Sequence, residues 1–194
     1  MHRYDWMVPT DEATAELGAA MYAQFLPGFA DRYRQRLSAE HLAVAEQFAG
    51  SFQQWSLGHD GPVTVTHGDY RLDNMLFGGP YPVAIVDWQT VRIGAGASDL
   101  AYFLGAGLNI EDRRRYEQRM VRHYHDALLH KGVGDYEFET CWNDYRRYSF
   151  SGLLMAVFAS MMVGQTERGD DMFVAMASRH AQQAIDLDAF EFLS

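Results

Sequence analysis

The sequence His67-Gly68-Asp69-Tyr70-Arg71-Leu72-Asp73-Asn74, followed thirteen positions later by Asp87 in Ile85-Val86-Asp87-Trp88-Gln89, decides the fold. A short β-branched run at residues 63–66 leads into this polar segment and predicts a strand. Residues 75–86 carry two more apolar runs around a Gly-Gly-Pro turn, which is typical of a small hairpin. The sequence therefore predicts that a polar loop and a hairpin hold several oxygen-bearing side chains close together.

Apolar residues recur at helical spacing before this segment. Two stripes over residues 1–57 predict two helices, with a break at Pro27-Gly28. The stripes consist of Leu17, Met21 and Phe25, and of Phe48, Phe52 and Trp55. The N-terminal third is therefore expected to be helical.

The helical period returns after Asp87, and several polar residues predict where helices begin. The helix opened by Asp135 is expected to be long and to include an apolar run. Tyr116, Met120, Tyr124 and Ala127 should share one face of a helix, and Phe173, Ala177 and His180 should share another. The expected helix caps are Ser98 or Asp99, Asn109, Asp135 and Thr166. The predicted fold class is α+β, mainly α: one domain over residues 1–194, with helices around a small β insertion.

Composition limits the classes of function. The chain has 194 residues, 48% apolar and 22% charged, as an ordinary packed protein does. A formal charge of −10 argues against a nucleic-acid surface, which needs clustered Lys and Arg. Cys141 is the only cysteine and no secretory signal is evident, so we expect a cytoplasmic protein. The uncharged stretch at residues 148–166 is expected to be a buried helix and not a membrane span, because it contains several polar residues.

Phosphoryl transfer explains why Asp69, Asn74 and Asp87 would be collected in one place. The transferring group is highly charged, so the protein must hold a divalent metal against the phosphates and position the acceptor. Magnesium prefers oxygen ligands, which Asn74 and Asp87 supply. A second carboxylate, Asp69, is available to orient the acceptor hydroxyl and take its proton.

The pattern H-x-D-x-x-x-x-N, followed by a strand ending in Asp-Trp, resembles the aminoglycoside phosphotransferase, choline kinase and ecdysteroid-kinase-like families. Those families share the protein-kinase-like fold, and Val86-Asp87-Trp88-Gln89 with Ser98-Asp99-Leu100-Ala101-Tyr102 is most similar to the ecdysteroid-kinase-like branch. The resemblance covers residues 63–108. It implies a catalytic role for Asp69, magnesium ligands in Asn74 and Asp87, a bracing role for His67, and in Asp99 a buried acceptor of backbone hydrogen bonds.

The resemblance also implies ATP as co-substrate, and a nucleotide-covering lobe with a Gly-rich loop and a strand Lys. The residues before His67 predict helices instead, and Lys131 is the only lysine. We therefore expect the C-terminal catalytic lobe alone, with an exposed surface open to self-association or to a partner lobe. The expected function is O-phosphorylation of a small-molecule hydroxyl, and the alternative is a non-catalytic, kinase-like binding or assembly module. The sequence does not specify the acceptor.

Other groups of residues give weaker signals. Arg71 and Gln89 lie in or next to the two motifs and are candidates for substrate or phosphate contacts. His123 and His125 are two positions apart, which on a helix points them in different directions and argues against a zinc site. Arg113, Arg114, Arg115 and Arg119 form a basic cluster, which is expected to be a solvated helix face.

Overall fold

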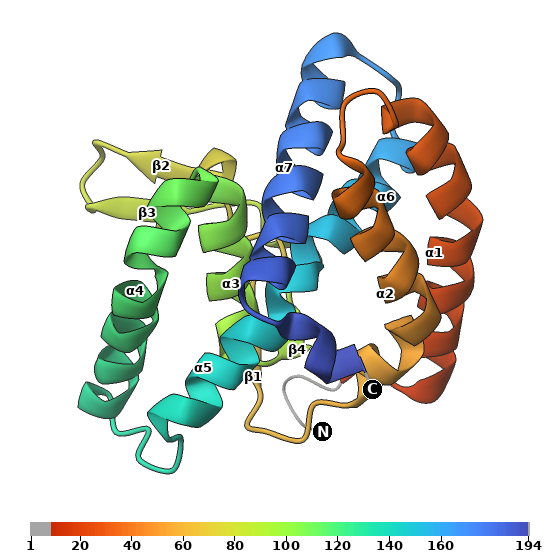
Figure 1. Ribbon diagram of the computed structural model, residues 1–194. Helices are drawn as coiled ribbons and strands as arrows, with labels where there is room; N and C mark the ends of the chain where they lie inside the picture. The colour runs from red at the N-terminus through yellow and green to blue at the C-terminus, as the bar shows by residue number, and fades with distance from the viewer. Residues whose placement is uncertain (1–8, 194) are drawn as a thin grey trace.

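The computed structural model describes residues 9–193. Within that range the chain is mainly helical, with strands of three residues each (Figure 1), so the predicted α+β, mainly helical class is confirmed. The helices are α1 (Glu12–Tyr33), α2 (Ala39–Leu57), α3 (Gly96–Gly107), α4 (Ile110–His130), α5 (Phe138–Arg147), α6 (Ser151–Met162) and α7 (Glu167–Asp186). The strands are β1 (Thr64–Thr66), β2 (Met75–Phe77), β3 (Val83–Ile85) and β4 (Arg92–Gly94).

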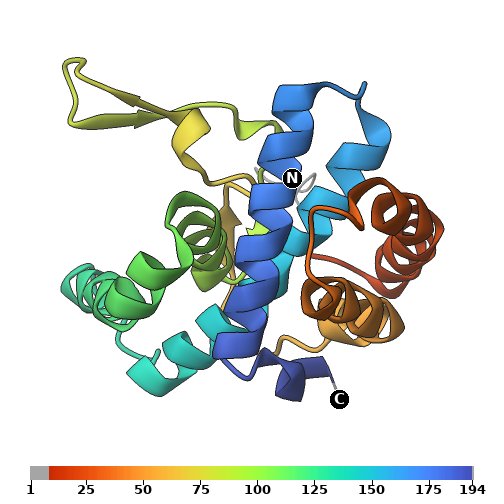
Figure 2. The ribbon, with the colours of Figure 1, turned by 45° about the horizontal axis from the view of Figure 1, so that its top comes forward.

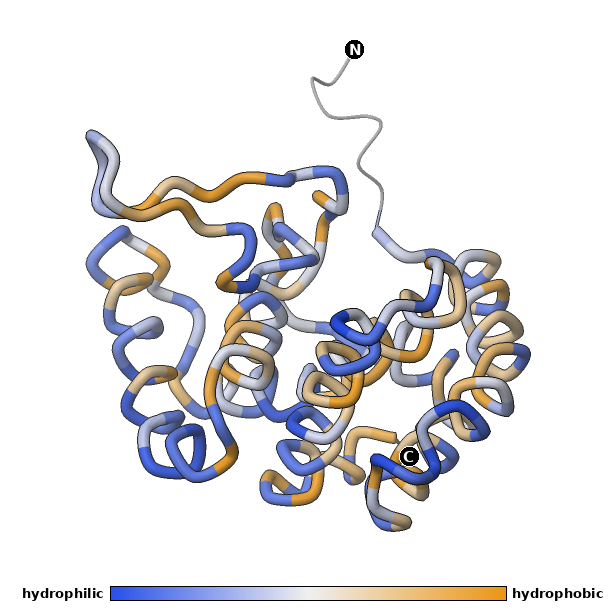
Figure 3. Tube along the Cα trace, turned by 90° about the horizontal axis from the view of Figure 1, so that it is seen from above, coloured by the Kyte–Doolittle hydropathy of each residue, from blue (hydrophilic) through white to orange (hydrophobic). Residues whose placement is uncertain are grey.

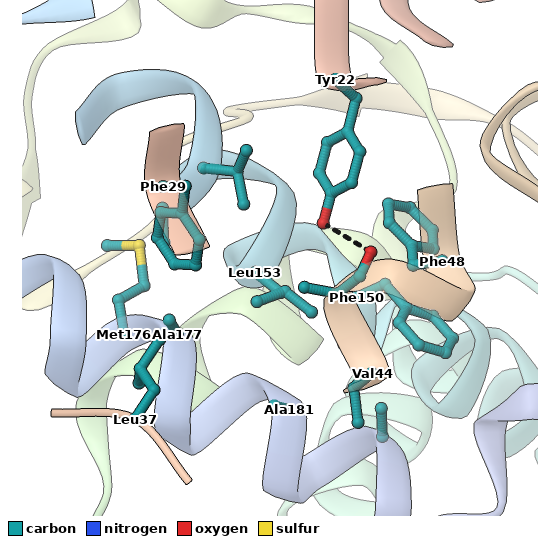
Figure 4. Packing of buried hydrophobic residues seen from close by; sticks show 14 of the residues in the cluster. Tyr22, Phe29, Leu37, Val44, Phe48, Phe150, Leu153, Met176, Ala177 and Ala181 are labelled. Atoms are coloured by element: carbon teal, nitrogen blue, oxygen red, sulfur yellow. Dashed lines mark hydrogen bonds between the residues drawn. The ribbon is translucent and has the colours of Figure 1, made fainter. Parts of the chain in front are cut away.

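The larger core lies where α1 and α2 pack on α6 and α7, and Figure 4 shows part of it. The Phe48 ring stacks on Phe150, with centroids 4.9 Å apart and an interplanar angle of 7°. The buried Tyr22 hydroxyl donates to the Ala45 carbonyl oxygen at 3.4 Å, which gives the phenol a polar partner inside the core. Aromatic packing therefore joins the helices that precede the polar loop to those at the C-terminus.

Helix α1 differs from the prediction in two ways. The predicted stripe is not the most buried face, because Leu17 is 62% exposed and Phe25 only half-buried against the core, while Tyr22 and Phe29 are fully buried. Apolar residues surround much of this helix, so spacing alone did not fix its buried face. Pro27 lies inside the helix instead of ending it.

A second core cluster joins α3, α4 and α5, and it contains the free thiol of Cys141. Asn109 and Thr166 cap α4 and α7 as predicted, whereas Asp135 caps nothing, since α5 begins after Glu137. The predicted long helix is also wrong, because a 3-10 turn at Tyr148–Phe150 separates α5 from α6. That turn carries Phe150 into the core against Phe48.

The most deeply buried positions of α4 include charged residues, while Met120 and Tyr124 of the predicted face are half-buried against the second core cluster. Arg113 is 1% exposed and forms ion pairs with Glu117 and Asp186, so the arginine cluster is not a uniformly solvated face. Ala127 is exposed, while the buried positions are Arg113, Glu117, Val121 and His125. On α7, by contrast, the predicted face of Phe173, Ala177 and His180 is buried.

Two antiparallel strand pairs position the polar loop. The predicted hairpin forms between β2 and β3, and it projects from the helical body (Figure 2). Strand β4 was not predicted; it pairs with β1, with Thr64 opposite Gly94. The loop therefore leaves one strand pair and enters the other.

Figure 3 shows apolar stretches along the hairpin as well as inside the helical body. Among residues 9–193, no helix is both long and apolar enough to cross a membrane. The uncharged stretch at residues 148–166 contains the short helix α6, whose Leu153, Ala156 and Val157 lie in the core.

Candidate active site

The loop begins with a turn at Gly68, where the backbone conformation strongly favours glycine. Gly68 has φ of +81°, and an added Cβ would lie 2.5 Å from the carbonyl oxygen of Thr90. Left-handed backbone is costly for residues with a Cβ, and here the space is filled as well. The Thr90 hydroxyl also donates to the His67 carbonyl oxygen at 2.8 Å. The bend after β1 is therefore held against the segment that precedes β4.

Asp99 fixes the start of the loop from α3. One carboxylate oxygen accepts the His67 N–H at 2.7 Å, and the other accepts the Gly68 N–H at 2.9 Å. The predicted cap role of Asp99 is wrong, because α3 begins at Gly96. The Asp99 carboxylate binds the loop instead. These two bonds are the contacts that the family resemblance implies for Asp99.

The buried His67 imidazole links the loop to the hairpin. Its Nε2 lies 2.9 Å from the carbonyl oxygen of Val86, and its Nδ1 accepts the Asp69 N–H at 3.2 Å. A carbonyl only accepts and a backbone N–H only donates, so these partners require the neutral tautomer protonated on Nε2. The Trp88 ring covers His67, with centroids 4.7 Å apart. His67 thus holds the backbone at Asp69 and at the residue before Asp87.

Three side chains hold the Asp69 carboxylate. Asn74 Nδ2 donates to Asp69 Oδ2 at 3.0 Å and to the Asp69 carbonyl oxygen at 2.9 Å. The Tyr102 hydroxyl donates to Oδ1 at 2.9 Å, and Arg71 Nε forms an ion pair with the same oxygen at 3.3 Å. Burial, and next the charge of Asp69, raise the pKa of the Tyr102 phenol far above its ordinary value, so the phenol remains a donor.

Tyr102 was not predicted as a site residue. Its spacing on α3 matches that of a core residue, and it is 97% buried, since only 3% of it is exposed. One signal was available: it directly follows Asp99-Leu100-Ala101, and a buried phenol normally needs a polar partner.

Asp87 lies next to Asn74 across the end of the hairpin. The Val86 N–H donates to the Asn74 carbonyl oxygen at 3.0 Å, one step beyond the pairing of Met75 with Ile85. Asp87 follows at φ 63° and ψ 60°, a left-handed conformation that is uncommon for residues other than glycine and costs about 1–3 kcal/mol. Such strain is frequent at functional sites.

The donor set fits magnesium. Both hydrogen bonds of the Asn74 side-chain amide use Nδ2, which leaves its carbonyl oxygen Oδ1 as the free acceptor. Asp87 is exposed, and its carboxylate makes no hydrogen bond or ion pair with the other described residues. One amide oxygen and one carboxylate suit an ion that keeps several waters. Within residues 9–193 there is no cluster of three His, Cys, Asp or Glu residues arranged for a metal.

Arg71 and Gln89, the two candidates for substrate or phosphate contacts, have different surroundings. Arg71 lies inside the loop, where it also forms an ion pair with Asp73 at 3.3 Å and contacts Met172 Sδ at 3.2 Å. Gln89 is exposed in the 3-10 turn Trp88–Thr90 and makes no hydrogen bond with another described residue. A cavity of about 300 Å³ lies between Arg71, Asp73 and α7, where Met172, Met176 and Arg179 line it.

Comparison with known proteins identifies the family of the chain. The ecdysteroid kinase-like family model matches residues 9–132, which is more than half of the chain and includes the loop, the hairpin and α3. The chain therefore belongs to the ecdysteroid kinase-like family, as the resemblance predicted.

Curated relatives share only part of the chain. It is 32% identical over 88 residues to acyl-CoA dehydrogenase family member 11 of Homo sapiens and of Pongo abelii, covering 39% of this chain and 11% of each relative. An uncharacterized kinase-like protein of Caenorhabditis elegans is 28% identical over 90 residues, covering 45% of this chain and 24% of that protein. The matched region thus spans about a tenth to a quarter of these relatives, and no solved structure matches.

Proposed function

We propose that this chain carries the catalytic half of an ATP-dependent O-phosphotransferase acting on a small-molecule hydroxyl. The kinase-like family supports the class of reaction. The observation that carries the proposal is the double hydrogen bond from Asn74 Nδ2 to Asp69, which joins the expected base to an expected metal ligand.

Each side chain has a distinct task in this proposal. Asp69 orients the acceptor hydroxyl and accepts its proton as the new bond to phosphorus forms. Asn74 Oδ1 and the Asp87 carboxylate are the oxygen ligands for Mg²⁺, which when bound would neutralise phosphate charge. Tyr102 and Asn74 keep the two oxygens of Asp69 in fixed directions.

The cavity beside α7 is the best candidate for the binding site of the acceptor. Arg71 joins that cavity to Asp69, since it forms the ion pair with Asp69 and also lines the cavity. Met172 and Met176 offer adaptable apolar surface there. Arg179 adds a second guanidinium, which favours an acceptor that carries an oxygen-rich or acidic group.

Exposed apolar side chains on and beside the hairpin support the proposal that a partner lobe or a second copy of this chain binds there. Phe77 and Leu76 of β2 are 66% and 57% exposed, and Trp88, in the 3-10 turn after the hairpin, is 49% exposed, which is unusual for large apolar side chains in one part of a fold. Sedimentation velocity distinguishes the two occupants: self-association that Phe77→Asp abolishes supports a second copy. A monomer at high concentration supports a separate lobe.

A binding or assembly module without turnover is the second candidate. The observation favouring it is that Asn74, Tyr102 and Arg71 together occupy both Asp69 oxygens, so the carboxylate has few lone pairs left for a substrate proton. The single lysine, Lys131, lies at the end of α4 and away from the loop in sequence, which also favours this candidate.

Calorimetry with Mg-ATP separates the two candidates. The kinase proposal predicts binding that requires metal and that Asp87→Asn weakens at least tenfold, because a charged oxygen ligand becomes neutral. Asp73→Asn is the matched control, since this exposed loop carboxylate forms an ion pair with Arg71 and has no assigned role in metal binding. Asp69→Asn should leave nucleotide binding nearly unchanged, because Asp69 is assigned to the acceptor hydroxyl and not to the metal. Nucleotide binding that is indifferent to metal and to Asp87 supports the binding module instead.

A further inference from the structure

A second cavity shares no lining residue with the acceptor cavity. Its volume is about 240 Å³, and Gly68 and Tyr102 form part of its wall, together with residues of α1, α2, β4 and α6. Asp69 does not line it, although Tyr102 donates to Asp69. The cavity is therefore separate from the proposed transfer site. The two are linked by Tyr102, which lines the cavity and donates a hydrogen bond to Asp69.

Most of the wall is aromatic or aliphatic. Phe52 and Trp55 of α2 face Leu154, Met155 and Phe158 of α6. The Phe52 and Phe158 rings are in contact, with centroids 6.3 Å apart, so the two helices already meet at this point of the wall. Rigid apolar walls of this kind are typical of pockets for small organic molecules. The volume is below the roughly 300–1,000 Å³ of pockets for drug-sized ligands, so the ligand must be smaller.

Arg92 supplies the positive charge of this cavity. Its side chain is exposed on β4, lines the cavity, and forms no ion pair with any other described residue. Burial raises the pKa of both the Tyr102 and Tyr148 phenols, and the positive charge of Arg92 opposes a small part of that rise. Both phenols line the same cavity, so the guanidinium lies close to its wall. An unpaired guanidinium beside an apolar hollow favours a carboxylate partner.

A polar group inside the wall also has no partner. The Ser151 hydroxyl is buried, and none of the described residues gives it a hydrogen bond. Buried hydroxyls are usually hydrogen-bonded, so the Ser151 hydroxyl is available to a polar group of a ligand. Ser151 lies on the α6 side of the cavity, together with the apolar side chains that would contact a ligand.

We propose that this cavity binds a small aromatic carboxylic acid, with the ring against the apolar side chains of the wall and the carboxylate on Arg92. The apolar walls account for the aromatic ring, and Arg92 accounts for the acid. Because Tyr102 lies between this cavity and Asp69, a bound acid would contact the residue that orients the proposed base. Neither ATP nor phosphoryl transfer is required for binding.

Phenylacetate and phenylacetamide are the probes, since they have the same shape and differ in charge. Protein-observed NMR titration in the absence of nucleotide should give saturable binding of phenylacetate at millimolar concentration. Arg92→Met should weaken phenylacetate binding at least tenfold and leave phenylacetamide unchanged. Arg168→Met is the matched control, because Arg168 is also exposed and does not line the cavity. Met155→Trp should abolish binding of both probes by filling the cavity, with folding checked by its thermal transition.

Three results would overturn the proposal. One is the absence of saturable phenylacetate binding to the wild-type chain, and another is equal affinity for the acid and the amide. The third is an equal loss of phenylacetate affinity in the Arg92 and Arg168 variants. These outcomes do not depend on Asp69, Asn74 or Asp87, so they leave the proposed phosphotransfer function to its own test.

Discussion

The Tyr102 hydroxyl donates a 2.9 Å hydrogen bond to Asp69 Oδ1, which ties α3 to the loop that follows β1. This contact spans 33 positions in sequence. It gives the proposed base a fixed direction from a helix and not only from its own loop. A rigid element holds a reactive group more firmly than a loop alone.

Tyr102→Phe tests that support. Removing the phenol oxygen deletes a hydrogen bond to a charged group, worth about 1.5–3 kcal/mol. We expect the free energy of unfolding to fall by that amount, as measured by urea denaturation. Tyr124→Phe is the control, because this half-buried phenol makes no hydrogen bond with another described residue. Equal losses in both variants would show that the Asp69 bond adds no stability.

Gly68→Ala tests the bend. The alanine must adopt φ near +81° and its Cβ meets the Thr90 carbonyl oxygen. Gly78 is the control, since it has φ of +82° with open space around the added Cβ. We expect Gly78→Ala to cost about 1–2 kcal/mol from backbone strain and Gly68→Ala about 1–3 kcal/mol more from the clash. Unfolding free energies that fall equally in the two variants would contradict the clash.

Asp99→Ala tests the attachment of the loop to α3. The substitution removes the acceptors of the His67 and Gly68 N–H groups, at about 1–3 kcal/mol for each buried donor left unpaired. Hydrogen exchange should therefore accelerate at these two amides and at Asp69, more than in the β2–β3 hairpin. Acceleration spread evenly over the whole chain would indicate general destabilisation instead.

His180 predicts a pH dependence of stability. It is fully buried, and burial lowers its pKa to about 4 from the usual 6.5. The unfolded chain binds a proton on this residue between those values and the folded chain does not, so stability rises with pH across that window and is flat above it. The shift corresponds to about 3 kcal/mol, lost as the pH falls from 6.5 to about 4.

Replacement of His180 by asparagine isolates this effect. An asparagine amide can still donate to the Ser149 carbonyl oxygen, which His180 Nδ1 contacts at 2.9 Å, but it does not titrate. The variant is expected to be less stable at neutral pH because it leaves space beside Gly105 and Gly152. Urea denaturation at several pH values should then show a shallower slope between pH 4 and 6.5. An unchanged slope would assign the dependence to other groups.

The sequence was most informative where chemistry constrains residue types. Asp69, Asn74 and the residue before Asp87 are joined by hydrogen bonds, and the predicted hairpin forms between β2 and β3. The carboxylate and amide had to be at those positions for the proposed reaction, so the motif alone placed them near one another. Their catalytic and metal-binding roles remain predictions.

Tertiary packing decided the features that the sequence did not reveal. Strand β4 is short and includes Gly94, and only its distant partner β1 makes it a strand. The break after α5 falls at the 3-10 turn Tyr148–Phe150, which contains no Gly or Pro. Its position depends on the packing of Phe150 on Phe48, which is not visible in the sequence. Tyr102 resembled a core residue, since its contact with Asp69 depends on how α3 meets the loop.

The most direct test of the central claim maps the metal site itself. Mn²⁺ is paramagnetic and broadens NMR signals of nearby nuclei, so a titration in the presence of ATP locates the ion. We predict that the amide signals of Asp69, Asn74 and Asp87 broaden first, and that Asp87→Asn prevents this. Broadening that begins at other acidic surfaces, or that persists unchanged in the variant, would contradict a phosphotransfer site at these three residues.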